Sequence, residues 1–432
     1  MRSLFLALIL FLSFASSVYG AQGIFTPAIG VGAEYTDNVY LTNDERESDI
    51  ILFVAPQLTV DLSRASRITR FFFSPSFRNY VKGVEDNVTH YNASCTVFMP
   101  ITRTTVFEFS DLYFLTDDPA EDLNDTTIRN SREIYYKNST SIGLKSQFGS
   151  FDSVYMRCVY SALRNDDPAR EDSDQVMPSA GIVYRFLPEW ILTLNTSYTF
   201  GEFLNKSTAD NSGDFDSINA TMRLSKQLTH FMDAFMQYSQ TFMRYKGQSE
   251  DYDILNPSIG ISVSVDDDPL FSIQIGYYLL DRHDTEDESG LTISGNLGQR
   301  FRFRKGDFSL SGSSGYDESY FGAENLGFEI YHQGQAAFNY ELTKNIRYQL
   351  SGKVRHGDYR NIRNKRIDIT KQVKTGFNWS FTEWLDVTFS YEYKNVDVNA
   401  AVTKASAVNE DYYENRFLLE AFFIPSAGRT RR

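Results

Sequence analysis

Histidine is the side chain that most often serves as a general base near neutral pH. The sequence contains five, widely separated along the chain: His90, His230, His283, His332 and His356. Only His283 has carboxylates close by, Asp281 and Asp284, in the stretch LLDRHDTEDES. No serine accompanies them at a spacing typical of a nucleophile. A hydrolase centred on His283 is therefore a minor hypothesis, and we predict no catalytic residue and no enzyme.

Two acidic stretches, Leu115–Asp125 and Asn165–Asp174, contain the oxygen ligands that Ca²⁺ prefers. Neither has the spacing of an EF-hand loop with its central glycine. The sequence therefore predicts solvated loops, or loops that bridge divalent ions loosely to lipopolysaccharide phosphates. We predict no metal site and no cofactor.

The strongest pattern is an alternation of side chains with period two. In Asn345–Tyr359, NIRYQLSGKVRHGDY, the apolar or small residues Ile346 to Val354 alternate with Arg, Gln, Ser and Lys. Period two is typical of a β-strand with two unlike faces. Similar runs include Trp190–Phe200, Ile218–Ser225, Phe271–Leu279 and Leu385–Lys394. Aromatic residues make up 15% of the chain, which also suits strands.

The connections between these runs also alternate, between short turns and longer acidic or Asn/Gly-rich loops. Short turns recur about every 37 to 40 residues, which is the length of a hairpin plus a long loop. Each interval has room for two strands that are longer than the usual five or six residues. A propeller blade would need four strands in the same interval, so the pattern does not favour a propeller. The sequence therefore predicts about 20 strands, with 18 as the alternative.

A soluble β-sandwich also alternates, but three features favour a membrane barrel. The strands are long, short turns alternate strictly with long loops, and aromatic residues such as Trp190, Trp384, Tyr391 and Tyr393 are expected at strand ends. We predict an all-β fold: one closed antiparallel transmembrane β-barrel over residues 21–432, with short periplasmic turns and long extracellular loops. Closure is required because an open sheet edge in lipid leaves backbone groups unpaired.

The polar face of each strand should then line a lumen. In the stretch above, Tyr348, Leu350 and Val354 are expected to face lipid. The candidate lumen-lining residues are Arg223, Arg300, Arg302, Arg347, Lys353, Arg355, Asp386, Glu392 and Arg416. Such mixed charge suits a hydrated polar polymer. Two interpretations of the arginines remain open: Arg300, Arg302, Arg347 and Arg355 form a basic stripe for an acidic glycan, or the charges pair across strands.

The first twenty residues have the features of a secretory signal peptide: Arg2, an apolar core and the small-residue ending SSVYG. No later stretch is long and apolar enough for a membrane helix. The net charge of −14 argues against nucleic acid as a partner. Cys95 and Cys158 are expected on lipid-facing positions of the fourth and seventh strands, too far apart for a disulfide.

Two terminal stretches resemble a known family. Glu34–Thr42, EYTDNVYLT, and Tyr412–Phe423, YYENRFLLEAFF, are similar to the outer-membrane β-barrel porins associated with exopolysaccharide and exosortase gene clusters. The resemblance implies the bacterial outer membrane as location and a role in polysaccharide secretion. We predict as partners outer-membrane lipid and lipopolysaccharide, together with exopolysaccharide and periplasmic export proteins. One departure is that IPSAGRTRR follows Phe423, where such barrels commonly end on an aromatic residue.

Two main functional hypotheses follow. The first is a porin-like channel that passes a polar polymer or assists its export. The alternative is a non-conducting barrel that acts as a structural or docking partner, or as a surface binder. A connection such as Thr116–Arg132 folding into the lumen would favour that alternative.

Overall fold

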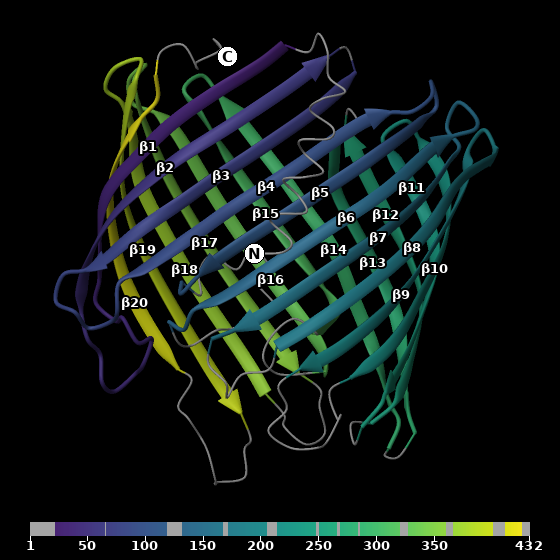
Figure 1. The fold of residues 1–432 in the computed structure, drawn as a ribbon. Helices are drawn as coiled ribbons and strands as arrows, with labels where there is room; N and C mark the ends of the chain where they lie inside the picture. The colour runs from purple at the N-terminus through teal and green to yellow at the C-terminus, as the bar shows by residue number, and fades with distance from the viewer. Residues whose placement is uncertain are drawn as a thin grey trace.

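The computed structural model describes residues 22–64, 66–118, 132–166, 172–204, 214–247, 250–265, 268–283, 286–319, 327–359, 366–400 and 411–425. These residues form a single antiparallel sheet of twenty strands (Figure 1). The sheet closes because the last strand pairs with the first. The strands are β1 (Gln22–Thr36), β2 (Asp49–Arg64), β3 (Arg67–Tyr80), β4 (Val88–Pro100), β5 (Thr105–Thr116), β6 (Tyr135–Gln147), β7 (Ser153–Asn165), β8 (Asp172–Leu187), β9 (Trp190–Leu204), β10 (Phe215–Thr229), β11 (Met232–Tyr245), β12 (Tyr252–Val265), β13 (Asp268–Arg282), β14 (Glu288–Phe303), β15 (Gly306–Ser319), β16 (Gly327–Glu341), β17 (Ile346–Tyr359), β18 (Arg366–Ser380), β19 (Leu385–Ala400) and β20 (Tyr412–Phe423).

The predicted barrel is thereby confirmed, with 20 strands and not 18. Short turns such as residues 304–305 alternate with longer connections such as residues 117–134. The near and far walls of the barrel are tilted in opposite senses, as Figure 1 shows for β1–β9 against β12–β20. Tilted strands of this kind are typical of transmembrane barrels.

Strand β17 shows how the alternation places its two faces. Leu350 and Val354 are 40% and 52% exposed, on the outside of the barrel. Arg355 is buried and points to the inside, where it contacts Glu329 of β16. The apolar side chains thus face lipid and the polar ones face the lumen, as predicted.

The predicted positions of the aromatic residues need one correction. Trp190 begins β9 and Trp384 lies in the short turn before β19, but Tyr391 and Tyr393 lie in the middle of β19. Trp384 stacks on Phe423, the last residue of β20, with 6.1 Å between ring centroids. An aromatic pair therefore closes the final strand on the short-turn side.

Burial within the barrel is uneven along its axis. Four buried apolar clusters all lie at or near the long-loop ends of their strands, and none lies at the short-turn ends of the described strands. Their members are Phe203, Phe215, Met243, Tyr252, Ile254, Tyr278 and Leu280; Val39, Ile51, Tyr80 and Val88; Leu41, Val396 and Tyr412; and Phe114, Tyr135 and Leu163. By contrast, inward residues near the short turns, such as Arg302 and Arg347, are exposed. The described inward side chains are therefore mostly buried at the long-loop end and mostly exposed or half-buried near the short turns.

The seam between β1 and β20 requires a glycine. These strands share eight residue pairs, and Gly32 lies opposite Glu420 among them. A Cβ atom on Gly32 would lie 2.5 Å from the Phe53 ring and 2.7 Å from the backbone oxygen of Leu419. We expect Gly32→Val to destabilise the closed barrel by about 1–3 kcal/mol through overpacking. The fraction of barrel that resists SDS before heating measures this.

A matched control is Gly334→Val on β16, because a Cβ atom there meets nothing within 4 Å. Equal loss of folded barrel in the two variants would contradict the steric explanation.

Residues 1–20, predicted to be a signal peptide, lie outside the described residues. Within the part of the chain that the structure describes, no helix is long and apolar enough to cross a membrane. Cys95 and Cys158 carry free thiols on β4 and β7.

Candidate functional site: a charged latch in the lumen

The long-loop end of the lumen contains a group of six oppositely charged side chains from four parts of the chain, five of them buried and one partly buried. Two belong to β20, one each to β1 and β3, and two flank the connection between β5 and β6. We call this group the latch: Glu34, Arg78, Asp118, Arg132, Glu414 and Arg416. It contains three arginines and three carboxylates, so its formal charge is balanced.

Arg416 is the centre of the latch. Its Nη1 and Nη2 donate to the two oxygens of Asp118 at 2.8 and 3.0 Å. The same guanidinium lies 3.4 Å from Glu414 and 3.5 Å from Glu34. Paired hydrogen bonds between arginine and carboxylate are among the strongest in proteins, so Arg416 fixes Asp118 firmly to β20.

Two further arginines complete the group. Arg78 Nη2 donates to Glu34 Oε2 at 3.0 Å, and Arg132 Nη2 donates to Glu414 Oε1 at 3.0 Å. Thr36 Oγ1 also donates to Glu414 Oε1, at 2.7 Å. The Arg132 side chain has no exposed surface. Each carboxylate of the latch therefore contacts at least one guanidinium.

The Asp118–Arg416 contact shows that the β5–β6 connection begins and ends inside the barrel. Five strand spacings separate β5 from β20 along the wall, which is roughly 24 Å at about 4.8 Å per spacing. A 2.8 Å contact between Asp118 and Arg416 therefore requires the residues after β5 to turn inward, across the lumen. Arg132, on the far side of the same connection, makes the same crossing.

A second set of bonds supports the start of this connection. Asp117 accepts a hydrogen bond from the Tyr80 hydroxyl at 2.6 Å, and His90 Nε2 lies 2.6 Å from its other oxygen. The Tyr135 hydroxyl donates to the Asp118 backbone oxygen at 3.2 Å. Buried hydrogen-bond networks of this kind hold a backbone in one position.

Not every donor in the latch is used. Arg132 Nε and Nη1, Arg78 Nε and Arg416 Nε are buried and make no hydrogen bond to the described residues. Each is a donor that water or a hydroxyl-rich solute can satisfy. The latch is therefore held by charge and a partial set of hydrogen bonds, which polar groups entering the lumen can compete for.

The Asp118–Arg416 ion pair should persist in mild acid. Burial alone would raise the pKa of Asp118, but Arg416 and Arg132 outweigh it and hold that pKa well below its usual range. A carboxylate with a depressed pKa stabilises the folded state above its unfolded pKa of about 3.9, and this is lost only as the pH falls further. We expect the single-channel conductance to be unchanged between pH 7 and about pH 4.5. Opening between pH 6 and 5 would contradict this assignment.

Of the two interpretations that the sequence leaves open for the lumen arginines, a basic stripe or pairing across strands, the structure favours pairing. Arg300 donates to Asp307 at 2.9 Å, and Arg347 lies 3.8 Å from Glu341, both near the short turns. Arg355 lies at the opposite end of β17, where it donates two hydrogen bonds to Glu329. Arg302 lies near Arg300 and is exposed. Three of the four are therefore paired across strands, and the four do not form one stripe.

The other candidates are distributed around the wall. Arg223 lies over the Phe235 ring, 3.5 Å from its centroid. Glu392 accepts a hydrogen bond from Gln372 at 2.7 Å, and the half-buried Lys353 and Asp386 lie on β17 and β19. Of all nine candidates, only Arg416 belongs to the latch.

Sequence reasoning missed the other five latch residues as candidate site residues. The available signal was a charge on the inward-facing positions of β1 and β3 at the long-loop end, which singles out Glu34 and Arg78. Asp118 could not be singled out from the sequence, because Leu115–Asp125 contains several carboxylates with no feature that distinguishes this one.

The remaining sequence candidates do not form a site among the described residues. His283 is exposed at the outer rim, and its ring makes no hydrogen bond to the described residues. Asp284, and most of the two acidic stretches, lie outside them.

No protein-family model and no curated protein matches the sequence. Among solved structures, the chain is similar to a mutant of the ferric enterobactin receptor PfeA from Pseudomonas aeruginosa in complex with enterobactin, with a TM-score of 0.53 and 8% identity over 94% of this chain and 82% of that one. It is also similar to the siderophore receptor PirA from Pseudomonas aeruginosa, with a TM-score of 0.51 and 10% identity over 94% and 81% of the two chains. At these identities the likeness shows the fold alone.

Proposed function

We propose that this chain is a channel of the bacterial outer membrane that passes a hydrated polar polymer, such as an exopolysaccharide, and that the latch restricts this passage. The barrel has 20 strands, well above the number at which side chains alone fill the interior, about eight. Exposed apolar side chains on its outside, such as Leu291 at 75% and Ile259 at 65%, support a lipid environment.

The observation that carries this proposal is the latch itself. Its flanking residues, Asp118 and Arg132, reach across the lumen, and they bind the wall through ion pairs. Contacts of this kind can be exchanged for contacts with water or solute without unfolding a strand. Ion pairs of this kind are therefore suited to a barrier that can open and close.

The lumen chemistry favours a hydrated polymer over a small anion. Most lumen arginines have a carboxylate close by, so the field across the lumen is weak, while Ser, Thr, Asn and Gln offer hydrogen bonds to sugar hydroxyls. The resemblance of the two terminal stretches to polysaccharide-associated porins supports the same solute.

The alternative is a non-conducting barrel that docks or binds a partner. Two observations favour it: the ends of the β5–β6 connection turn into the lumen at Asp118 and Arg132, and four apolar clusters lie buried at the long-loop end. A barrel whose loop end never opens would serve as a platform rather than a passage.

Conductance separates the two functions. The full chain is reconstituted in a planar bilayer, and current is recorded before and after the host polysaccharide is added on either side. We expect small conductance steps that the polysaccharide shortens. A barrel that inserts but stays silent, both as the natural chain and with the latch removed, would support the non-conducting alternative.

A further inference from the structure

The outer wall of the barrel contains a polar group that the proposed channel does not use. Asp111 lies near the middle of β5, where it pairs with Cys95 of β4 and Thr140 of β6. Phe114, three residues along, points inward into a buried cluster with Tyr135 and Leu163. Because side chains alternate along a strand, Asp111 faces outward, toward lipid.

The position of Asp111 along its strand is unlike that of most outward-facing charges on the neighbouring strands β7 to β12. Those charges lie within two residues of the long-loop ends of their strands, and several are ion-paired, as in Arg164 with Asp174 and Arg244 with Asp253. Asp111 is in the middle of its strand and has no ion-pair partner among the described residues. A carboxylate at this depth is costly in hydrocarbon.

The immediate neighbours of Asp111 satisfy only one of its oxygens. Thr140 Oγ1 and Asn138 Nδ2 both donate to Oδ1, at 2.5 and 3.1 Å. The second nitrogen–hydrogen bond of Asn138 is used by the backbone oxygen of Leu112 at 3.1 Å. No described residue donates to Asp111 Oδ2. The site therefore presents an unused acceptor to the membrane.

The same surface also presents unused donors. The hydroxyl groups of Tyr91, Tyr113 and Tyr136 lie on the outward face of β4, β5 and β6 and make no hydrogen bond to the described residues. The rings of Tyr113 and Tyr136 are 5.8 Å apart. A patch that holds both an unused acceptor and unused donors is complementary to itself, which is the requirement of a two-fold interface between identical chains.

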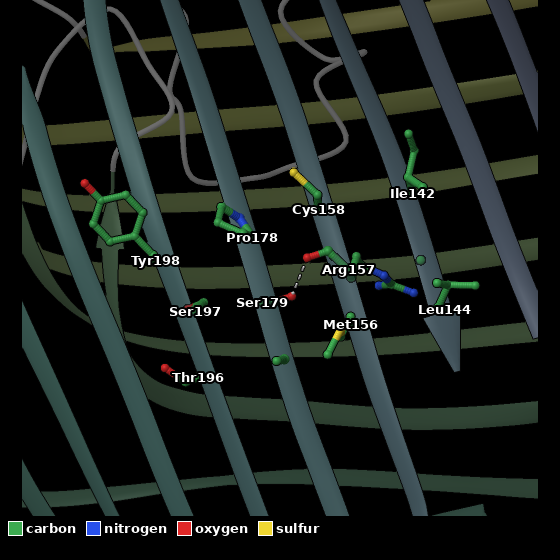
Figure 2. A pocket seen from close by; sticks show the side chains of 12 residues that line it. Ile142, Leu144, Met156, Arg157, Cys158, Pro178, Ser179, Thr196, Ser197 and Tyr198 are labelled. Atoms are coloured by element: carbon green, nitrogen blue, oxygen red, sulfur yellow. Dashed lines mark hydrogen bonds between the residues drawn. The ribbon is translucent and has the colours of Figure 1, made fainter. Parts of the chain in front are cut away.

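The outer surface beside this patch is concave. A shallow groove of about 510 Å³ lies over β6 to β9, and its residues include Ile142, two positions from Thr140. Figure 2 shows Ile142, Leu144, Met156, Cys158 and Pro178 around it. Lipid removes the usual hydrophobic drive for association, so close packing and polar contacts decide which surfaces pair in a membrane. The groove, which adjoins the patch at β6, supplies a surface for close packing. Asp111 supplies the polar contact.

We propose that the outward face of β4 to β6, centred on Asp111, is an interface at which two copies of this chain pair within the membrane. In the pair, Asp111 of each copy accepts hydrogen bonds from tyrosine hydroxyls of the other. Cys95, directly beside Asp111 in the ladder, then lies close to its counterpart in the second copy.

The test is the mass of the folded full-length chain in detergent and in lipid nanodiscs, by light scattering. We expect the natural chain to have twice the monomer mass, and Asp111→Leu to raise the dissociation constant about tenfold or more. Asp111→Asn should keep the pair. The control is Thr375→Leu, which removes an outward-facing hydroxyl on the distant strand β18 and should change nothing.

A thiol cross-link gives an independent readout in native membranes. In a Cys158→Ser background, a short bifunctional maleimide should join two chains through Cys95, and adding Asp111→Leu should abolish the product. Resistance to SDS before heating shows that each variant is folded. A monomeric natural chain, a dimer that survives Asp111→Leu, or a cross-link to a different protein would overturn the proposal.

Discussion

Replacing Asp118 and Arg132 together with alanine is expected to raise the single-channel conductance, or the fraction of time spent open, several-fold. The double change removes one charge of each sign, so that Glu34, Arg78, Glu414 and Arg416 remain as a balanced set on the wall. Both flanks of the β5–β6 connection lose their contacts with β20. Because the wall keeps its own pairs, the barrel should remain folded while its closure is released. Planar-bilayer recording of the two proteins measures the effect.

The matched control removes another ion pair from the lumen. Arg300→Ala with Asp307→Ala deletes a 2.9 Å pair near the short turns, far from the latch. We expect this variant to keep the conductance of the natural chain. If the latch variant and the control behave alike, the latch does not restrict passage.

Replacing Arg355 with leucine should cause the largest loss of stability among the lumen variants. Arg355 donates two hydrogen bonds to Glu329, at 2.9 and 2.8 Å, and the Glu329 side chain has no exposed surface. Removing one member of a buried ion pair typically costs about 3–5 kcal/mol, because the remaining charge stays desolvated. The free energy of unfolding in urea, from the folded state in detergent, is the quantity to compare.

Strand β17 also provides the control for that comparison. Arg347 points to the same lumen from the other end of the strand, 3.8 Å from Glu341, and both side chains are more than half exposed. An exposed pair of this kind is worth about 0–1 kcal/mol, so Arg347→Leu should be nearly neutral. Equal losses in the two variants would mean that burial does not set the cost.

The strands could be predicted because the alternation of apolar and polar residues lies within the sequence of each strand. In β17 the identity of each residue fixes its face, since alternate positions must meet either lipid or water. The terminal stretch Tyr412–Phe423, which was singled out by its resemblance to a family, coincides with the last strand. The mid-strand positions of Tyr391 and Tyr393 were missed because the alternation gives the face of a residue and says little about its depth.

The candidate site was only partly predictable because it depends on contacts between distant residues. Arg416 and Asp118 are 298 positions apart in the sequence, and they meet only after the barrel closes and the residues directly after β5 turn inward. The choice between the two open interpretations of the lumen arginines, a basic stripe or pairing across strands, depends on such contacts as well. Arg347 and Arg355 share a face but are eight residues apart, or roughly 27 Å along an extended strand.

The intervening strands favour the second interpretation, pairing across strands. Asp307 on β15 and Glu341 on β16 lie between the arginines of β14 and β17. They form ion pairs with Arg300 and Arg347. Alternation assigns each of these charges to the lumen but leaves their pairing undetermined. Pairing follows from register, which the turns and bulges of the closed sheet determine.

The seam between β1 and β20 has a consequence for the order in which the barrel is assembled. It has eight residue pairs, the shortest ladder among the described strands. Before it forms, the sheet has two free edges, and four of the six latch charges lie near them: Glu34 and Arg78 near the first edge, Glu414 and Arg416 on the last. Ring closure brings these opposite charges together in one step. The Glu34–Arg416 contact across this seam therefore helps to hold the ring closed, and the barrier proposed above can form only after the ring has closed.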